Sequence, residues 1–160
     1  MVRLGKLTDY GLLLMCQMAR KPLPGWHAAR DLAVECRLPL PTVSKLLKTL
    51  LQGGLVVSQR GIKGGYTLAR DPHEISLAEI ISAVEGPFGL TECSTDVGGL
   101  CDLEASCPIK DNQRIISSVV RGALERVMLS DLTRPMRLTA IRDNKGNLVP
   151  MISGGSGRVQ

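Results

Sequence analysis

The sequence predicts a mainly α-helical protein with one small β-hairpin. Hydrophobic residues make up 44% of the 160 residues, but aromatic residues make up only 2%. The core must therefore consist of aliphatic residues and methionine, which favours helices over a sandwich or a barrel. Apolar residues recur every three or four positions in several segments, which is the spacing of amphipathic helices. One stretch, VVSQRGIKGGYTLAR at 56–70, has the pattern of two strands joined by a turn rich in glycine and lysine.

Charge divides the chain into a basic and an acidic half. Residues 1–72 carry 11 Lys and Arg against 4 Asp and Glu, a net charge of +7, and residues 73–160 carry 9 against 11, a net charge of −2. A basic half can face a polyanion such as nucleic acid, although a solvated basic face is also common. No apolar run approaches the roughly 20 residues that cross a bilayer, so no membrane association is expected.

The N-terminal segment and the cysteine count indicate the compartment. Residues 10–19 are mostly apolar and follow Arg3 and Lys6, but no small-residue cleavage site comes after them, so secretion is not expected. Five cysteines, an odd number, also argue against a disulfide scaffold. We therefore expect a protein of the reducing cytoplasm.

Three helices are predicted before the hairpin. Thr8 can cap the first of them. Residues 27–55 then hold two amphipathic helices, because the prolines of RLPLP stop one helix and start the next. A Gly-Gly pair ends the second of these helices. The two apolar stripes consist of Ala29, Leu32 and Ala33, and of Val43, Leu46, Leu47, Leu50 and Leu51.

Two short helices joined by a tight turn form the helix-turn-helix pattern, in which the second helix enters the DNA major groove. The face of this helix away from the core would carry hydroxyls and lysines, which can bond to phosphates and base edges. These residues are Thr42, Ser44, Lys45, Lys48 and Thr49. A helical hairpin in any small bundle looks similar, so this feature alone does not establish DNA binding.

A β-hairpin directly after the second helix would be the wing of a winged helix-turn-helix domain. Arg60 and Lys63 at its tip suit a phosphate backbone or a minor groove. Gly64 and Gly65 would let the backbone approach DNA closely, and we place Tyr66 with them in the interface. A surface hairpin without a ligand is the plain alternative. The helix-turn-helix, the basic wing and the charge division together predict double-stranded DNA as a partner.

The DNA-binding domain is expected to span 1–86 and to end with a short helix, which opens with the capping box SLAE at 76–79. A cysteine-bearing loop is expected at 87–107, and a long dimerisation helix at 108–132. The apolar stripe of that helix needs a partner, and a second copy in a two-fold dimer would suit a palindromic operator. Residues 133–160 contain Pro, Asn and GGSG and are expected to be a flexible tail without stable structure.

Three cysteines of the loop, Cys93, Cys101 and Cys107, have the spacing C-x7-C-x5-C. Structural zinc sites usually contain close ligand pairs, so zinc is possible but not favoured. Acidic residues around the loop disfavour free thiolates, whereas bound iron would relieve the repulsion. We rank an iron–sulfur cluster (2Fe–2S or 4Fe–4S) above zinc, and zinc above redox-active thiols. Cys16 and Cys36 lie at apolar helix positions and are expected to be inert.

Several motifs, in their order along the chain, resemble the IscR/NsrR-type family of bacterial winged-helix regulators, whose members bind iron–sulfur clusters. They are LTDYGLLLM at 7–15, the helix-turn-helix, RGIKGGYTLAR at 60–70, SLAEIISAVEGP at 76–87 and the three-cysteine loop. The loop sequence TECSTDVGGLCDLEASCP is most similar to regulators of the SUF iron–sulfur assembly system. The resemblance covers about 1–132 and implies a homodimer whose subunits each hold a cluster through the loop cysteines and one further ligand. We therefore expect a repressor of cluster-assembly genes.

The fourth ligand is where the sequence departs from part of this family. IscR-type members have a histidine three residues after the third cysteine, where this chain has Lys110, and an ammonium group offers no lone pair. Nitric-oxide sensors of the family instead use an aspartate that matches Asp9 and reaches the cluster from the partner subunit. A first-turn aspartate also interacts favourably with the helix dipole. Glu92, Glu104, an exogenous thiol or water are further alternatives.

Rival functions stay open from the sequence alone. One is a DNA-binding regulator that holds zinc or uses thiol chemistry, and another is a nitric-oxide or redox sensor of the same fold. An iron–sulfur electron carrier or scaffold without DNA binding fits the basic half poorly. An enzyme is not expected, because no Ser–His or Cys–His arrangement is identifiable. The two histidines, His27 and His73, are expected at the surface.

Overall fold

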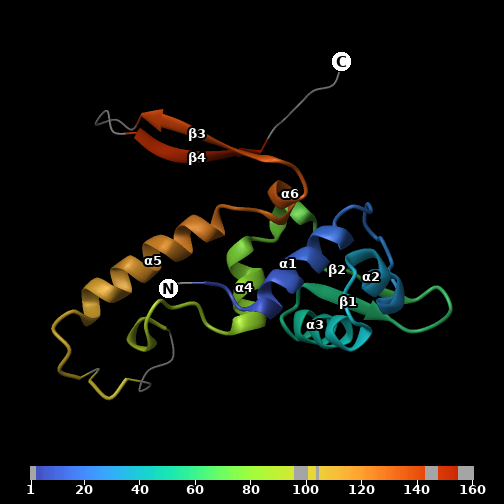
Figure 1. The fold of residues 1–160 in the computed structure, drawn as a ribbon, viewed down its shortest axis with the longest axis horizontal. Helices are drawn as coiled ribbons and strands as arrows, with labels where there is room; N and C mark the ends of the chain where they lie inside the picture. The colour runs from blue at the N-terminus through green and yellow to red at the C-terminus, as the bar shows by residue number, and fades with distance from the viewer. Residues whose placement is uncertain (1–2, 96–100, 104, 143–147, 155–160) are drawn as a thin grey trace.

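The structure is a computed structural model that describes residues 3–95, 101–103, 105–142 and 148–154. It confirms a mainly helical fold with a two-stranded hairpin after the third helix (Figure 1). The elements are α1 (Lys6–Met18), α2 (Ala29–Cys36), α3 (Leu40–Gln52), β1 (Val56–Gln59), β2 (Gly65–Leu68), the 3-10 turn η1 (Pro72–Glu74), α4 (Leu77–Glu85), the 3-10 turn η2 (Glu92–Ser94), α5 (Lys110–Glu125), α6 (Leu129–Leu132), β3 (Met136–Arg142) and β4 (Leu148–Gly154).

The core lies where α1 to α4 meet, and it is aliphatic as predicted. Figure 1 shows α1 between α4 on one side and α2 on the other, with α3 beneath them. The largest buried side chains, apart from His27, are leucine, isoleucine and methionine: Leu14, Met15, Met18, Leu32, Leu46, Leu47, Leu50, Leu55, Ile75, Ile80 and Leu129. The stripe of α3 is narrower than predicted, because Leu51 is 38% exposed.

The first helix does not begin as the sequence predicted. It begins at Lys6 with Gly5 as its N-cap residue, and no side chain caps it. Thr8 is buried in the first turn, and its hydroxyl donates to the Glu85 carboxylate at the end of α4. The same carboxylate accepts the N–H of Gly5 at 2.8 Å. Thr8 is therefore a tertiary contact that ties the start of α1 to α4, and not a helix cap.

The turn between α2 and α3 confirms the helix-turn-helix. Arg37 ends α2 in the left-handed region with φ 54°, which reverses the chain direction within a few residues. Pro39 is the N-cap residue of α3, and a second proline lies in its first turn, where the missing N–H costs nothing. Gly53 and Gly54 follow α3, and Gly54 has φ 70°.

The wing is confirmed as an antiparallel hairpin in which Val56 pairs with Leu68 and Gln59 pairs with Gly65. Its second strand also bonds to the segment before α2. The N–H of His27 donates to Tyr66 O at 2.9 Å, and the N–H of Tyr66 donates to His27 O at 2.8 Å. The wing is thus attached to the helical core by backbone hydrogen bonds as well as by packing.

The region predicted as one helix to residue 132 contains a break. The capping box of α4 is present, but α5 ends at Glu125 and a short α6 begins at Leu129. Between them the backbone runs beside the start of α4: the N–H of Leu77 donates to Val127 O at 2.7 Å, and the N–H of Leu129 donates to Ile75 O at 2.8 Å. Val127 and Leu129 are both buried in this way. Residues two positions apart in a continuous helix point to opposite sides, so one straight helix would not bury both against the same surface.

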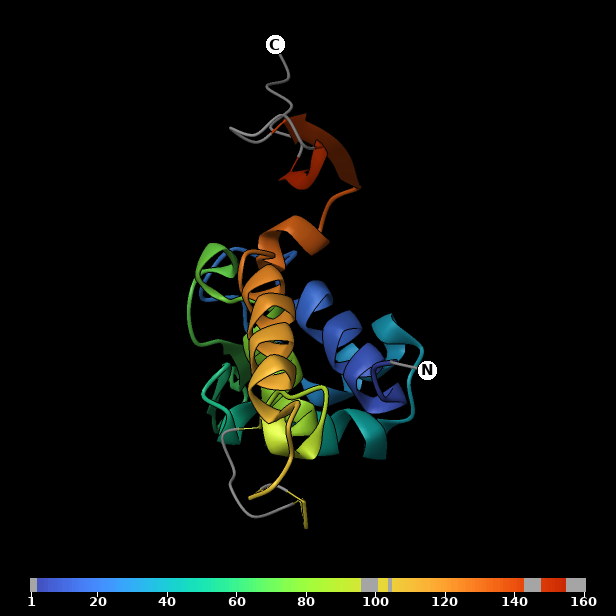
Figure 2. The ribbon, with the colours of Figure 1, turned by 90° about the vertical axis from the view of Figure 1, so that its left-hand side faces the viewer.

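The segment predicted as a flexible tail contains a second hairpin, so that prediction is wrong for its described part. Strands β3 and β4 pair antiparallel, with Met136 opposite Gly154 and Arg142 opposite Leu148. Figures 1 and 2 show this hairpin beyond α6, away from the helical core. Residues 143–147 and 155–160 of the predicted tail lie outside the described residues. Within the described part of the chain, no helix is long and apolar enough to span a membrane.

Candidate nucleic-acid interface and cysteine loop

The solvent-facing side of α3 presents the residues that the sequence predicted for DNA. Ser44, Lys45 and Lys48 are exposed. Thr42 and Thr49 are half-buried, and the Thr49 hydroxyl donates to Lys45 O at 3.1 Å. Two ammonium groups and one hydroxyl on an exposed helix face are suited to phosphate and base-edge contacts.

The wing presents a basic tip, as predicted. Arg60 and Lys63 are exposed on the turn between β1 and β2, and Ile62 between them is fully exposed. Isoleucine at such a tip was not singled out from the sequence, although apolar side chains at this kind of position can wedge into a minor groove. The cations at the wing tip and on α3 therefore lie at the same end of the molecule.

Three residues near the wing turn have roles within the protein itself. A side chain at Gly64 would collide with Gln59 O, and a side chain at Gly65, which has φ 143°, would collide with His27 O. Tyr66 is half-buried and packs against the core. These residues shape and anchor the wing. Their contact with DNA stays a prediction.

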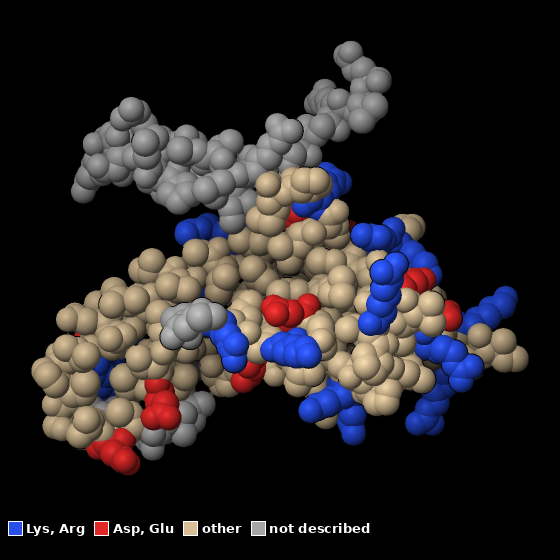
Figure 3. Space-filling model, in the orientation of Figure 1, with Lys and Arg blue, Asp and Glu red and all other residues tan. Residues whose placement is uncertain are grey.

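The charge division predicted from the sequence appears on the surface. Figure 3 shows most of the Lys and Arg side chains of this face over the end that carries the helix-turn-helix and the wing. Asp and Glu side chains lie near the start of α5, and others lie in the middle of the face and among the basic side chains. Net positive potential at one end attracts a polyanion and orients it toward that end.

His27 is not at the surface as predicted, because it is only 2% exposed. Its backbone holds the wing, and neither ring nitrogen has a hydrogen-bond partner among the described residues. Burial lowers the pKa of this imidazole, and the nearby Lys21 lowers that pKa further. His27 is therefore a neutral, buried histidine at the position where strand β2 of the wing pairs with the segment before α2.

The three loop cysteines occupy different positions beside α5. Cys93 is buried in η2, its Sγ lies 3.4 Å from Thr91 Oγ1, and its carbonyl accepts the Nε–H of Arg114 at 3.1 Å. Cys101 and Cys107 are half-buried, and all three thiols are free. Within the described part of the chain, no three His, Cys, Asp or Glu side chains are grouped closely enough to hold a metal ion. Residues 96–100 and Glu104 of the loop lie outside the described residues.

Asp9 and the remaining cysteines can also be placed. Asp9 is exposed in the first turn of α1, where its charge faces the positive end of the helix dipole, and it makes no capping hydrogen bond. Cys36 is buried and Cys16 is half-buried against the core. Burial raises the pKa of both thiols, which keeps them protonated and unreactive, in keeping with their predicted inert role.

One side of α5 is apolar and exposed. Ile115, Ile116 and Val119 are 61%, 49% and 66% exposed. The opposite side packs against α4 and the segment after it, where the hydroxyl oxygen of the buried Ser117 accepts the N–H of Leu90 at 3.1 Å. Of these three residues, only Ile116 belongs to the apolar stripe that the sequence predicts for 108–132, whose other members are Ile109, Val120, Ala123, Leu124, Val127 and Met128.

Comparison with known proteins identifies the family. Residues 4–135 match the family described as "Rrf2: Iron-dependent Transcriptional regulator". The chain belongs to the Rrf2 family. It is 27% identical to the HTH-type transcriptional regulator NsrR of Shouchella clausii over 131 residues, which cover 82% of this chain and 88% of that protein. It is also 27% identical to the regulator IscR of Serratia proteamaculans over 146 residues, 91% of this chain and 88% of that protein.

Solved structures agree with this assignment. The structure of CymR (YrzC), the global cysteine regulator of B. subtilis, superimposes with a TM-score of 0.64 at 28% identity, covering 83% of this chain and 97% of CymR. The Rrf2 chain is therefore a winged helix-turn-helix, DNA-binding transcriptional regulator and not an enzyme. The β3–β4 hairpin begins after the last residue of the family match.

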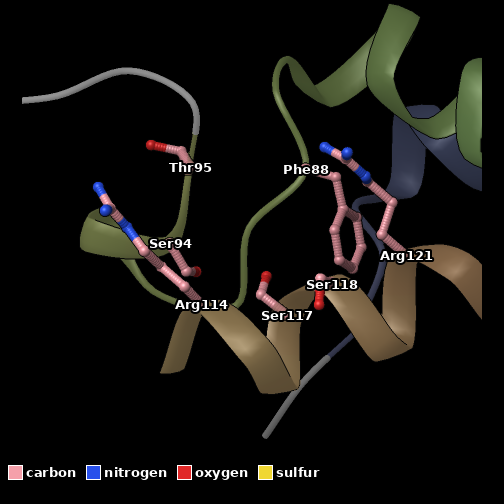
Figure 4. Close-up of a pocket in the computed structure, with 7 residues that line it drawn as sticks. All are labelled: Phe88, Ser94, Thr95, Arg114, Ser117, Ser118 and Arg121. Carbon is pink, nitrogen blue, oxygen red and sulfur yellow. The ribbon is translucent and has the colours of Figure 1, made fainter. Parts of the chain in front are cut away.

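Sequence reasoning missed two features of this Rrf2 protein that lie beside the predicted site. Arg114 lies near Ser94 and Thr95, and Arg121, on the same side of α5, lies beside Phe88 (Figure 4). Their spacing of seven residues, two helical turns, was a readable signal for one common side of a helix. The link between Glu85 and Thr8 had no such signal, because it joins residues far apart in the sequence.

Proposed function

We propose that this Rrf2 regulator binds a palindromic operator as a homodimer, responds to iron–sulfur cluster status and represses genes of the SUF cluster-assembly system in the cytoplasm. The observation that supports this most is the position of three free cysteines between the DNA-binding core and α5, one side of which is apolar and exposed. The family description as iron-dependent agrees with it.

The homodimer is supported by α5. Three large aliphatic side chains on one side of a helix would lose most of their exposed area against an equivalent surface, at about 25 cal/mol for each Å² removed from water. A two-fold axis beside α5 would present two copies of α3, as half-sites of a palindrome require.

The thiol chemistry of the loop fits an iron–sulfur cluster. Cys93, Cys101 and Cys107 supply three thiols without a disulfide, and Thr91 Oγ1 beside Cys93 Sγ can support a ligating sulfur. A bound cluster would supply sensitivity to iron supply, oxidants and nitric oxide. The exposed Asp9 on α1 is free of a capping role and is the fourth ligand that we favour, from the partner subunit. Glu92, Glu104 or an exogenous ligand are the alternatives, and Lys110 is excluded by its chemistry.

The residues around Cys93 connect the loop to the dimer helix. Arg114 on α5 holds the carbonyl of Cys93, and Ser117 holds the backbone N–H of Leu90. The other end of α5 is held to α4 through Val127 and Leu77. A change in the position of the cysteines is therefore transmitted to α5, and from α5 to the separation of the two copies of α3.

The test is an anaerobic visible absorption spectrum with iron and sulfide assays, together with band shifts on a palindromic promoter fragment. We expect a brown protein, and we expect the triple variant Cys93→Ser, Cys101→Ser, Cys107→Ser to lose both colour and cluster-dependent operator affinity. Cys16→Ala is the matched control and should keep both. A protein that stays colourless after reconstitution, or a triple variant that binds the operator as the holo form does, would show that the cluster proposal is wrong.

One observation favours a second candidate, a regulator that uses zinc or thiol chemistry. The described residues do not bring three ligands together, and thiols that are not preassembled can also react individually. Such a protein would bind the operator without visible absorption. Bleaching of the colour by nitric oxide but not by iron limitation would instead identify a nitric-oxide sensor.

A further inference from the structure

The tip of the wing carries an apolar side chain that no described residue covers. Ile62 is 107% exposed, which makes it the most exposed large apolar side chain of the described residues. A single exposed apolar residue is common on soluble proteins, so its surroundings decide whether it has a role.

Ile62 occupies the corner of a hydrogen-bonded turn. The N–H of Gly64 donates to Gly61 O at 3.0 Å, so Ile62 and Lys63 are the two central residues of a four-residue β-turn. Gly61 begins this turn with φ 118°, a backbone conformation that favours glycine. Figure 1 shows the turn projecting beyond α2 and α3. Ile62 is therefore presented at the projecting end of the wing.

The turn is held by a firmly bonded hairpin. Strands β1 and β2 pair from Val56 opposite Leu68 to Gln59 opposite Gly65. Behind these pairs, the N–H of Ala69 donates to Leu55 O at 3.0 Å, and the backbone bonds between strand β2 and the segment before α2 fix the hairpin to the core. A side chain on a preorganised support loses little further freedom on binding, so Ile62 can be pressed into a ligand without the wing folding aside.

Two cations flank Ile62. Arg60 and Lys63 are exposed, and no ion pair joins either side chain to another residue in the described part of the chain. They can bind phosphates and so hold the tip at a minor groove, which leaves the apolar side chain to meet the base edges. The cations of α3 lie at the same end of the molecule, which favours duplex DNA over other polyanionic surfaces.

We propose that Ile62 is an apolar wedge that enters the minor groove beside the major groove occupied by α3, partly unstacks one base step and bends the operator. Unstacking costs least at the flexible pyrimidine–purine steps TA and CA/TG. Ile62 thereby makes the regulator selective for a flexible step at a position that α3 does not touch. The inference rests on the DNA binding in the proposed function and deepens it, but it depends neither on a cluster nor on the genes that are regulated.

The test is selection from a pool of random-sequence duplexes by the full-length protein after anaerobic reconstitution. Fluorescence energy transfer between the ends of a selected duplex then measures its bend. We expect a TA or CA/TG step enriched beside each half-site and a bent duplex. Ile62→Ser should weaken binding by about tenfold, straighten the duplex and lose the step preference while keeping the half-site. Ile62→Leu should keep the bend and the preference, because its side chain is apolar and of the same volume.

Two variants on the same hairpin are matched controls. Val57→Ser removes another exposed apolar side chain, 43% exposed on β1 and away from the tip, and should leave the bend unchanged. Arg60→Gln should reduce the salt dependence of binding and keep the step preference, because phosphate contacts carry no sequence information. The thermal unfolding midpoint of Ile62→Ser should equal that of wild type, since the side chain is outside the core.

Equal bending and equal step preference in wild type and Ile62→Ser, or a straight duplex in the wild-type complex, would overturn the proposal. If Ile62→Ser bends DNA as wild type does but no longer binds phosphatidylglycerol vesicles, the tip serves an anionic membrane surface and the wedge is wrong. A colourless protein that still selects and bends a duplex would contradict only the cluster proposal. A pool that yields no selected duplex would contradict DNA binding itself, and the wedge with it.

Discussion

Helices α3 and α5 are both strongly amphipathic, but they use their apolar sides differently. In α3 the apolar side chains Val43, Leu46, Leu47 and Leu50 are at most 2% exposed, and the polar side faces solvent. In α5 the apolar side chains Ile115, Ile116 and Val119 are about half exposed or more, while the polar Ser117 is buried. An amphipathic pattern in the sequence therefore states only that an apolar surface must be covered. It does not state whether the same chain covers it.

The largest expected effect contrasts the two helices directly. Leu47→Ala should lower the free energy of unfolding by about 2–5 kcal/mol, because it opens a cavity in the core. Val119→Ala should change the unfolding free energy of the monomer by less than about 0.5 kcal/mol, because Val119 is exposed in the single chain. Urea denaturation at low protein concentration measures both. Equal losses would show that α5 contributes to the core as α3 does.

The second effect concerns association. A charge buried without a partner at a subunit interface is strongly unfavourable, so Val119→Glu should raise the dimer dissociation constant by about a hundredfold. Sedimentation equilibrium measures this change, and operator affinity should fall with it. Ser118→Glu places the same charge on another side of α5 and serves as the control. If both variants dissociate equally, the apolar side of α5 is not the dimer interface.

A smaller effect is expected on the polar side of α3. Lys48→Ala should reduce the slope of log K against log salt by about one for each subunit, because one phosphate contact is lost. Band shifts at several salt concentrations provide the slope. Arg126→Ala, directly after the end of α5, should leave the slope unchanged. An unchanged slope for Lys48→Ala would remove Lys48 from the interface.

The smallest expected effect is a pH dependence at the wing joint. Burial lowers the pKa of His27 in the folded state, so the unfolded state binds the proton more readily. Stability from this group is complete above the unfolded pKa of about 6.5 and is lost as the pH falls below it toward the lowered folded value. Melting temperatures between pH 8 and pH 5 should fall less steeply for His27→Gln than for wild type. The exposed His73→Gln is the control and should follow wild type.

Local signals explain which parts of the fold could be predicted. The prolines before α3, the glycines after it and the capping box Ser76–Glu79 each act within a few residues, so the helix-turn-helix, the wing and α4 follow from the sequence. The break between α5 and α6 depends on backbone bonds to Ile75 and Leu77, some fifty residues earlier, and no local pattern contains it.

The candidate site shows the same division. The exposed cations of α3 and the wing were predictable because amphipathic spacing identifies the outer side of a helix and turn residues identify a loop tip. The burial of His27 was not predictable, because it results from strand β2 pairing with the segment before α2. The position of Arg114 and Arg121 beside the segment after α4 also depends on how that segment folds back, which the cysteine spacing alone does not specify.

The backbone bonds between residues 75–77 and 127–129 give α5 the geometry of a lever arm with its pivot at the C-terminal end. A helix of 16 residues is about 24 Å long, at 1.5 Å for each residue. A rotation of roughly 10° about the pivot would displace the other end, which adjoins the cysteines, by about 4 Å. Conversely, a displacement of about 4 Å at the cysteine end of α5 corresponds to a small rotation at its C-terminal end. That end lies next to α4, which is bonded to α1 through the Thr8 hydroxyl and the Glu85 carboxylate.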